Sequence, residues 1–360
     1  MASIGQALVD YWRRITYGEQ LSFLARMLRG GLWLASFGYG WAVWWRNWAY
    51  DRRWLRGQRV GVSVLSVGNL TVGGTGKTPF VAWLAHWLDA LGYRVAIVSR
   101  GYGARNGLND EALELAWELP HIPHWQGANR VALAQWAAAQ GVEVVILDDG
   151  MQHRQLHRDV EIVLVDASDP WGGGYLLPRG RLREPRTALG RADIIVLTRA
   201  ELVSATVLAD LAESTARFAP QALQAIAQHQ PRYLTNVAGE RQNLDTLAGR
   251  KVAAFCGIGH PEAFAAHLRQ LGAEIIAWRI FPDHHTYSDT DLNELAQWLA
   301  RQGEASWVVT TRKDLVKLPQ REIAGKPLWA LVAGMEIVQG QQALQQRILR
   351  VLPAEQRLAA

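Results

Sequence analysis

Apolar runs of strand length alternate with segments of helical periodicity from residue 61 almost to the end of the chain. Residues 62–67 contain three valines and a leucine and predict a buried strand, and the apolar residues of 80–91 recur at helical spacing before Gly92. Four more runs are predicted as strands, at 94–99, 142–147, 161–165 and 193–198, with a helix at 131–139. Strands separated by helices favour a doubly wound, mostly parallel sheet, in which ligands bind at the carboxyl ends of the strands.

The alternation is interrupted after residue 200 by a helical stretch that leads to Pro231, and it then restarts. Strands are predicted at 252–256, 274–280, 307–311 and 328–332, and a helix is predicted to end at Leu271. We therefore expect an α/β protein with two domains, the second smaller than the first. The predicted segments are 1–56 at the N-terminus, 57–230 for the first domain and 231–360 for the second.

The N-terminal segment contains a charge-free stretch, 30–45, with arginines on both sides. As a helix it would be about 24 Å long, shorter than the roughly 30 Å hydrocarbon core of a bilayer, so a full crossing is not expected. Six large aromatic residues in this stretch and just after it share one sector of a helical wheel: Trp33, Phe37, Trp41, Trp44, Trp45 and Trp48. An aromatic stripe beside arginines is typical of a helix in the membrane interface. Packing on the protein's own core is the alternative.

Composition narrows the class of protein further. The 360 residues are 49% hydrophobic and 20% charged, which is typical of a globular protein with sizeable cores. The single cysteine, Cys256, cannot form an internal disulfide and fits a reducing compartment such as the cytoplasm. The net charge of +5 resides in residues 1–56, which hold eight arginines and three acids, so the rest of the chain is neutral. A neutral body argues against nucleic-acid binding.

The strongest chemical signal is the turn between the first predicted strand and the first predicted helix. It reads Gly73-Gly74-Thr75-Gly76-Lys77-Thr78, the end of a phosphate-binding loop, with Thr71 where the general pattern has glycine. The glycines let backbone N–H groups approach phosphate closely, Lys77 can reach the β- and γ-phosphates, and Thr78 is the expected Mg²⁺ ligand. A glycine-rich turn without a ligand needs neither the lysine nor the threonine. The sequence therefore predicts a nucleotide site.

Acidic and basic residues follow other predicted strands. The strand at 142–147 leads into Asp148 and Asp149, as a Walker-B strand leads to its Mg²⁺-binding acid, although a turn or helix cap is the alternative. A basic-acidic cluster follows further along, and its members are Arg179, Arg181, Arg183 and Glu184. Arginines there bind phosphate or stabilise transferred charge, unless they are solvated surface residues. In the second domain, 283–285 (Asp-His-His) is a candidate for metal ligands, an acid–base pair or a polar loop.

Four motifs in this order, residues 66–79, Ser99-Arg100-Gly101-Tyr102-Gly103, Asp148-Asp149-Gly150-Met151-Gln152-His153 and Asp283-His284, resemble the tetraacyldisaccharide 4'-kinase family of lipid A biosynthesis. The resemblance covers nearly the whole chain, including the aromatic N-terminal helix, 257–261 and 311–314. Threonine in place of the first loop glycine is itself typical of that family. The combination is far more specific than any one of the motifs.

The resemblance implies a P-loop NTPase-like kinase that uses Mg²⁺ and ATP to phosphorylate the 4'-hydroxyl of a lipid-linked tetraacyldisaccharide 1-phosphate. It would work at the cytoplasmic face of the inner membrane, with the N-terminal helix at the membrane surface and without nucleic acid or a required protein partner.

The resemblance also implies roles for single residues. Asp110 matches the family's catalytic aspartate, with His284 of the second domain as its partner, so closure of the two domains over ATP is expected. The acids associated with the metal would be Asp148 or Asp149, together with Glu184. The positions near the substrate head group are Asn69, Tyr102, His153 and Arg183.

A membrane-associated regulatory or partitioning P-loop ATPase is the main alternative, because Gly73–Thr78 also resembles the loop of that class. That loop carries an extra lysine where this chain has Val72. A GTP-dependent metal chaperone would need a Cys/His-rich tract, and the sequence has none.

Overall fold

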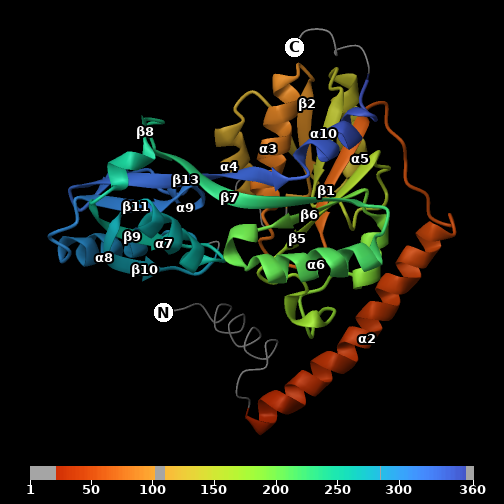
Figure 1. The fold of residues 1–360 in the computed structure, drawn as a ribbon, viewed down its shortest axis with the longest axis horizontal. Helices are drawn as coiled ribbons and strands as arrows, with labels where there is room; N and C mark the ends of the chain where they lie inside the picture. The colour runs from red at the N-terminus through yellow and green to blue at the C-terminus, as the bar shows by residue number, and fades with distance from the viewer. Residues whose placement is uncertain (1–21, 102–109, 284, 354–360) are drawn as a thin grey trace. The chain divides into compact units, whose positions relative to one another are not determined.

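The computed structural model describes residues 22–101, 110–283 and 285–353 (Figure 1). The chain divides into two compact units. Unit 1 comprises Met1–Gly101, His121–Gln228 and Ile337–Ala360, and unit 2 comprises Tyr102–Pro120 and His229–Glu336. The chain passes between the units inside two long strands, β7 (Leu223–Thr235) and β13 (Lys326–Gln339).

Unit 1 is built on a sheet with the strand order β7-β6-β5-β1-β4-β2-β3, and all these neighbours pair in parallel. The strands are β1 (Ser63–Asn69), β2 (Val95–Ser99), β3 (His124–Gln126), β4 (Val144–Asp148), β5 (Val160–Asp166) and β6 (Ile194–Thr198). β1 lies between β4 and β5: the chain runs from β1 to β2 on one side of it and later continues through β5 and β6 on the other. The carboxyl end of β1 is therefore the switch point, where such sheets bind ligands.

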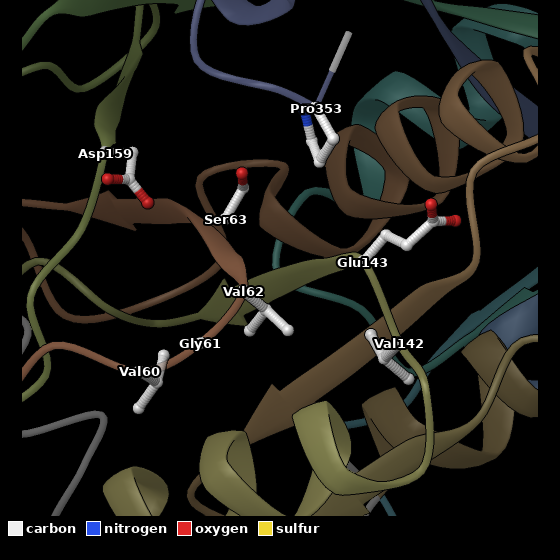
Figure 2. A pocket seen from close by; sticks show the side chains of 8 residues that line it. All are labelled: Val60, Gly61, Val62, Ser63, Val142, Glu143, Asp159 and Pro353. Atoms are coloured by element: carbon white, nitrogen blue, oxygen red, sulfur yellow. The ribbon is translucent and has the colours of Figure 1, made fainter. Parts of the chain in front are cut away.

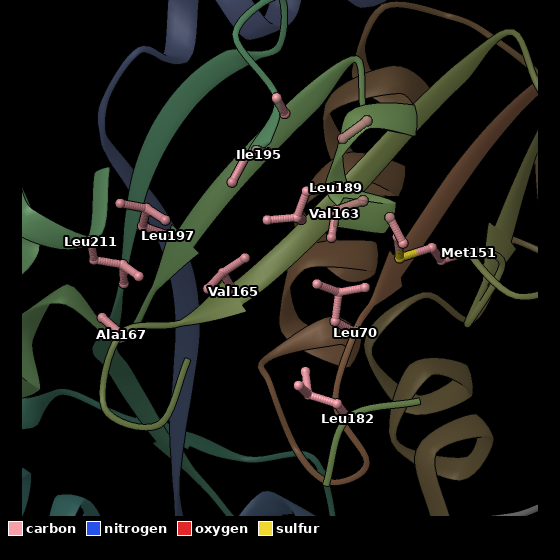
Figure 3. Packing of buried hydrophobic residues seen from close by; sticks show 13 residues of the cluster. Leu70, Met151, Val163, Val165, Ala167, Leu182, Leu189, Ile195, Leu197 and Leu211 are labelled. Carbon is pink, nitrogen blue, oxygen red and sulfur yellow. The ribbon is translucent and has the colours of Figure 1, made fainter. Parts of the chain in front are cut away.

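Helices and buried loops cover this sheet. The main helices of unit 1 are α3 (Lys77–Ala90), α5 (Arg130–Ala139), α6 (Ala205–Phe218) and α10 (Gln341–Leu349), with short 3₁₀ turns at η1 (Gly172–Gly174), η2 (Arg186–Arg191) and η3 (Ala200–Leu202). Figure 3 shows one buried cluster, in which Leu70, Met151 and Leu182 from three separate loops pack with residues of β5 and β6. This packing fixes the loops that follow β1 and β4.

Unit 2 has its own parallel strands, in the order β10-β9-β11-β13. They are β9 (Lys251–Cys256), β10 (Glu274–Ile280), β11 (Trp307–Thr311) and β13, while β12 (Glu322–Ile323) and β8 (Arg241–Gln242) pair antiparallel with β13 and β7. The helices are α4 (Asp110–Glu118), α7 (Pro261–Gln270), α8 (Asp289–Ala300), α9 (Arg312–Leu315) and the 3₁₀ turn η4 (Leu244–Leu247). The mostly parallel α/β architecture agrees with the predicted fold class.

The compact units differ from the predicted segments at α4 and α10. Arg312 forms ion pairs with Glu114 (3.6 Å) and Glu118 of α4, and Trp117 packs on a core of unit 2. α10 instead belongs to unit 1, where Arg347 pairs with Asp193 (2.5 Å). These partners lie far apart in the sequence, so no local pattern announces them.

Strand β7 was missed from the sequence, and β13 is longer than the predicted 328–332. β7 carries Gln224, Gln228, His229 and Gln230 before Pro231, so its apolar content is low for a strand and its proline reads as a break. The helix predicted after residue 200 ends earlier, at Phe218.

The N-terminal helix α2 (Phe23–Asp51) is longer than the charge-free stretch that predicted it. Ser22 caps it by accepting a hydrogen bond from the N–H of Ala25 (3.3 Å), and the helix continues through Arg26, Arg29 and Arg46. Its aromatic stripe is exposed, with Phe37 59% and Trp41 68% accessible, so the stripe does not pack on the protein's own core. Within the described ranges, no helix combines the length and apolar character needed to cross a bilayer.

A buried carboxylate in unit 2 gives a stability prediction. Asp314 is fully buried and accepts hydrogen bonds from the Gly257 N–H (2.9 Å), the Tyr287 hydroxyl (3.0 Å) and the Thr311 hydroxyl (2.7 Å). Asp314→Ala leaves these donors unpaired, at about 1–3 kcal/mol each when buried. We expect the free energy of unfolding in urea to fall by about 3 kcal/mol or more. Glu322→Gln at an exposed position is the control, and a loss no greater than that of the control would contradict the network.

Candidate functional site

The turn after β1 has the shape of a phosphate-binding loop. Gly73 and Gly76 have φ values of 113° and 85°, a region that glycine adopts without strain. A Cβ atom on Gly73 would also collide with the guanidinium of Arg181. The hydroxyl of Thr198, at the end of β6, donates a hydrogen bond to the carbonyl of Thr75 (2.9 Å) and ties the loop to the sheet. The chain thus adopts the backbone that the glycines predict.

Helix α3 begins at Lys77, directly after this turn. The N–H groups of its first turn and the positive end of its dipole are therefore presented at the loop. Phe80 and Leu84 are fully buried and hold the helix against the sheet. A helix N-terminus fixed in this way at the end of a central strand favours binding of an anion such as phosphate.

The side chains of Lys77, Asp149 and Arg183 form the charged centre of the site. The Lys77 ammonium lies 3.5 Å from a carboxylate oxygen of Asp149 and donates to the side-chain oxygen of Asn69 (3.1 Å). Arg183 places one Nη atom 2.8 and 2.7 Å from the two carboxylate oxygens of Asp149. The structure therefore brings together the carboxyl ends of β1 and β4 and the basic cluster after β5.

Asp149 is held by its backbone as well as by its side chain. Its φ of 52° is left-handed, and its carbonyl accepts a hydrogen bond from Arg130 (3.0 Å). Burial acts to raise the pKa of Asp149, but Lys77 and Arg183 outweigh burial and lower the pKa below its usual value. The carboxylate is consequently ionised at neutral pH.

The loop after β4 carries two more of the predicted residues. Gln152 donates to the carbonyl of Asn69 (3.0 Å) and accepts from Arg183 (3.2 Å), which joins this loop to the end of β1. Burial and the charges of Arg130 and Arg158 lower the pKa of His153 to about 4. His153 is therefore neutral at pH 7.

Glu184 lies in a different environment from Asp149. Its carboxylate is fully buried, with one oxygen 3.2 Å from Arg46 and the other bonded to Asn47 (2.7 Å) and Arg191 (2.9 Å). These contacts hold α2 against the rest of unit 1 and involve neither Lys77 nor Asp149. A role for Glu184 at the metal remains a prediction.

Three other candidates have less structural description. Tyr102 and His284 lie outside the described residues. Asp110 is the first residue of α4, which belongs to unit 2. The segments on both sides of His284 belong to the same unit, whereas the sequence assigned Asp110 and His284 to different domains.

The sequence analysis missed two basic residues near the charged centre and the phosphate-binding loop. Arg130, at the start of α5, is buried and bonds to the backbone of Asp149, and burial lowers its pKa to about 10, so it keeps its charge at pH 7. Arg199 pairs with Asp166 at the end of β5. A single arginine at a helix start or strand end carries no pattern of its own, so neither residue has a sequence signal.

A pocket elsewhere in unit 1 is not part of this site. This cavity has a volume of about 310 Å³ and is lined by Val60, Ser63, Glu143 and Asp159, among others, and Figure 2 shows the side chains that line it. Ser63 is the first residue of β1, so the cavity opens at the amino edge of the sheet, opposite the phosphate-binding loop.

The fold and the charged centre define a P-loop protein, in which a strand, a glycine-rich loop and a helix present lysine beside the acid of a neighbouring strand. A family model described as tetraacyldisaccharide-1-P 4'-kinase matches residues 28–353. The chain therefore belongs to the tetraacyldisaccharide 4'-kinase family of lipid A biosynthesis, which confirms the predicted family and activity.

Individual relatives agree with the family model. Tetraacyldisaccharide 4'-kinase of Syntrophus aciditrophicus (strain SB) is 41% identical over 318 residues, 81% of this chain and 85% of the relative. The enzyme of the same name from Anaeromyxobacter sp. (strain Fw109-5) is 36% identical over 361 residues, 94% of each chain. The crystal structure of LpxK from Aquifex aeolicus in complex with ATP superposes with a TM-score of 0.72 at 32% identity, covering 91% of this chain and all of that one (100%).

The environment of His153 gives a pH prediction. Its pKa is about 6.5 in an unfolded chain and about 4 in the folded protein. Between these values the unfolded state binds more protons, so the contribution of His153 to stability is present above pH 6.5 and is lost as the pH falls towards 4.

Because Arg130 contributes to the low value, Arg130→Met should raise the pKa of His153, as measured by NMR titration of its ring protons. Arg94→Met, at the amino end of β2, is the control and should leave that pKa unchanged. A titration of His153 near 6.5 in the unaltered protein would contradict the described environment.

Proposed function

We propose that this chain transfers the γ-phosphoryl group of ATP to the 4'-hydroxyl of a lipid-linked tetraacyldisaccharide 1-phosphate, with the loop 73–78 as the ATP site. The observation that carries the proposal is the contact of Asp149 with both Lys77 and Arg183 near the carboxyl end of the central strand, in a chain of the kinase family. The ATP bound in the related Aquifex aeolicus structure supports the choice of nucleotide.

The loop and its neighbours supply charge stabilisation for phosphoryl transfer. Phosphoryl transfer leaves little covalent chemistry to the protein, so positioning and neutralisation of negative charge carry most of the catalysis. Lys77 neutralises the β- and γ-phosphates, and the N–H groups of 73–78 bind their oxygens. Arg183 exchanges part of its contact with Asp149 for the transferred group or the substrate phosphate.

The residues present fit a Mg²⁺ ion that is shared with the nucleotide. Among the described residues, no three His, Cys, Asp or Glu side chains group into a metal site of their own. Mg²⁺ typically uses one or two carboxylates and completes its shell with phosphates and water. Thr78, Asp148 and Asp149 are the residues that would hold it, and bound Mg²⁺ neutralises charge on the phosphates.

Asp110 and His284 carry the proton of the acceptor hydroxyl in this proposal. An aspartate has an unperturbed pKa of about 3.9 and is ionised at pH 7, so Asp110 accepts the proton while His284 orients the carboxylate. The assignment of α4 and of the segments around His284 to one unit supports their acting as a pair without domain closure. Near the head group, Asn69, Tyr102 and neutral His153 offer hydrogen bonds to the sugar.

The membrane surface is the proposed place of action. The substrate's acyl chains lie in a bilayer, and α2 exposes a row of large apolar residues beside unit 1: Phe23, Leu24, Met27, Leu34, Phe37, Trp41, Trp44 and Trp45. A helix of this kind lies in the interface plane with its apolar face among the lipids. We place the protein at the cytoplasmic face of the inner membrane, as a peripheral protein without an obligatory protein partner.

The test of the chemistry is transfer of radiolabel from γ-labelled ATP to a lipid disaccharide 1-phosphate in detergent. We expect labelled lipid with the unaltered protein. Lys77→Ala should reduce transfer by at least about a thousandfold, because it removes the cation nearest the transferred group. Release of labelled phosphate without labelled lipid would instead favour the regulatory ATPase alternative and contradict the kinase proposal.

The test of membrane contact uses the exposed stripe. Phe37→Gln with Trp41→Gln should weaken binding to liposomes by about a hundredfold, because two large side chains each lose about 1.5 kcal/mol of apolar burial in the interface. Trp136→Gln is the matched control, since Trp136 is 47% exposed but lies on α5. Equal binding of the double variant and the control in flotation assays would move membrane contact away from α2.

A further inference from the structure

A second pocket of unit 1, different from the one in Figure 2, lies where α2 ends, and its lining is basic. Its volume is about 450 Å³, and it is lined by residues from 50–57, from the 154–161 loop and from Arg191 and Asp193. Glu161 and Asp193 stand at the amino ends of β5 and β6, whereas Lys77 follows the carboxyl end of β1. In the pairing of β1 with β5, Glu161 lies opposite Ser66, three residues before the carboxyl end of β1 at Asn69, which is about 10 Å of strand at about 3.3 Å per residue. The pocket is therefore separate from the phosphate-binding loop.

Positive charge predominates in the lining. Two acids line the pocket, and both are already paired: Glu161 with Arg158 (2.5 Å), and Asp193 with Arg347 (2.5 Å). The lining arginines are Arg53, Arg56, Arg154, Arg158 and Arg191. Of these, Arg154 pairs with Asp51 (2.7 Å) and lies over the ring of Tyr50. Arg53 and Arg56 are exposed, and no acid in the described part of the chain pairs with either.

Arg191 has donors that no group of the described chain satisfies. Its Nη1 lies 2.9 Å from the buried carboxylate of Glu184, while its Nε and Nη2 are buried without a hydrogen-bond partner. Buried donors, above all charged ones, normally have acceptors because leaving them unpaired is costly. The Arg191 side chain is 22% exposed and lines the pocket, so a change of its rotamer presents these two adjacent N–H groups to the paired oxygens of a phosphate.

We propose that this pocket binds the phosphate group of an anionic phospholipid headgroup. A phosphate that belongs to a lipid is favoured over a free phosphate ion because exposed apolar side chains lie next to the arginines. Trp54 and Leu55, between Arg53 and Arg56 in the sequence, are 68% and 46% exposed, and the aromatic stripe of α2 that precedes them is exposed as well. Apolar side chains next to arginines match the boundary between acyl chains and headgroups. The proposal rests on the membrane location in the proposed function and adds a preference for anionic lipid at a defined pocket.

The sharpest variant is Arg191→Lys. Lysine keeps the positive charge and can still pair with Glu184. It lacks the Nε and Nη2 donors, which are the two that we assign to the phosphate. We expect about a fivefold loss of affinity for vesicles that contain phosphatidylglycerol in phosphatidylcholine, because the paired charge-assisted hydrogen bonds from the guanidinium to the phosphate are lost, and no change for phosphatidylcholine alone. Since net charge is unchanged, binding equal to that of the unaltered protein would overturn the proposal, and a thermal melt establishes that the variant is folded.

A second pair of variants does not depend on the buried ion pair. Arg53→Asn with Arg56→Gln removes two exposed charges of the pocket, and asparagine tolerates the left-handed backbone of Arg53 (φ 61°). Arg26→Gln with Arg59→Gln removes two exposed charges outside the lining. The pocket pair should lose about twenty-five-fold in affinity for the anionic vesicles, and the outside pair clearly less. Equal losses would show diffuse charge attraction and overturn the pocket.

Two further measurements distinguish binding of a lipid headgroup from binding of a free anion, and failure of this proposal from failure of the proposed function. If inorganic phosphate raises the melting temperature of the unaltered protein while both vesicle types bind equally, the pocket takes a free anion and the lipid proposal fails. Phosphoryl transfer in detergent is measured on the same samples. If transfer is absent but the preference for anionic vesicles depends on Arg191, the proposed function fails while the lipid site stands.

Discussion

The burial of the Glu184 carboxylate decides where α2 lies on unit 1. A buried carboxylate without partners costs several kcal/mol, and here Arg46 and Asn47 of α2 supply two of the three side chains that satisfy it, with Arg191 as the third. The neighbouring Arg183 instead contacts Asp149 at the phosphate-binding site. Two consecutive residues thus link the exposed aromatic helix and the charged centre of the site.

This linkage continues through the residues on both sides. Leu182 forms a bridge with Thr71 and packs in the core of unit 1, and Arg181 donates to the carbonyl of Val72 (2.8 Å). Tyr39 of α2 donates its hydroxyl to the carbonyl of Arg183 (2.9 Å). A displacement of α2 therefore disturbs the loop after β1, so the position of this helix and the geometry of the phosphate site are not independent of each other.

The sequence predicted those parts of the fold that local patterns encode. The strands around β1 and β4 were placed within two residues, and the spacing located Lys77, Asp148 and Asp149, because a strand end followed by glycine or acid is a local signal. The pairing of Glu184 with Arg46 spans 138 residues and has no such signal. The contact of Arg130 with Asp149 has no local signal either. Nor has the place of α4 in unit 2, which depends on its ion pairs with Arg312.

The arginines near the N-terminus do not act as one uniform basic patch. Arg46 is engaged by Glu184, and Arg52 lies over the ring of Trp48. Because charges engaged inside the protein attract a membrane less than free ones, the +5 of residues 1–56 overstates the electrostatic attraction of this region. In the proposed membrane contact, the exposed tryptophans then supply more of the binding free energy than the composition suggests, and the unengaged arginines after α2 determine which headgroup is preferred. Under that proposal, apolar area sets the strength of contact, and a few placed charges set its selectivity.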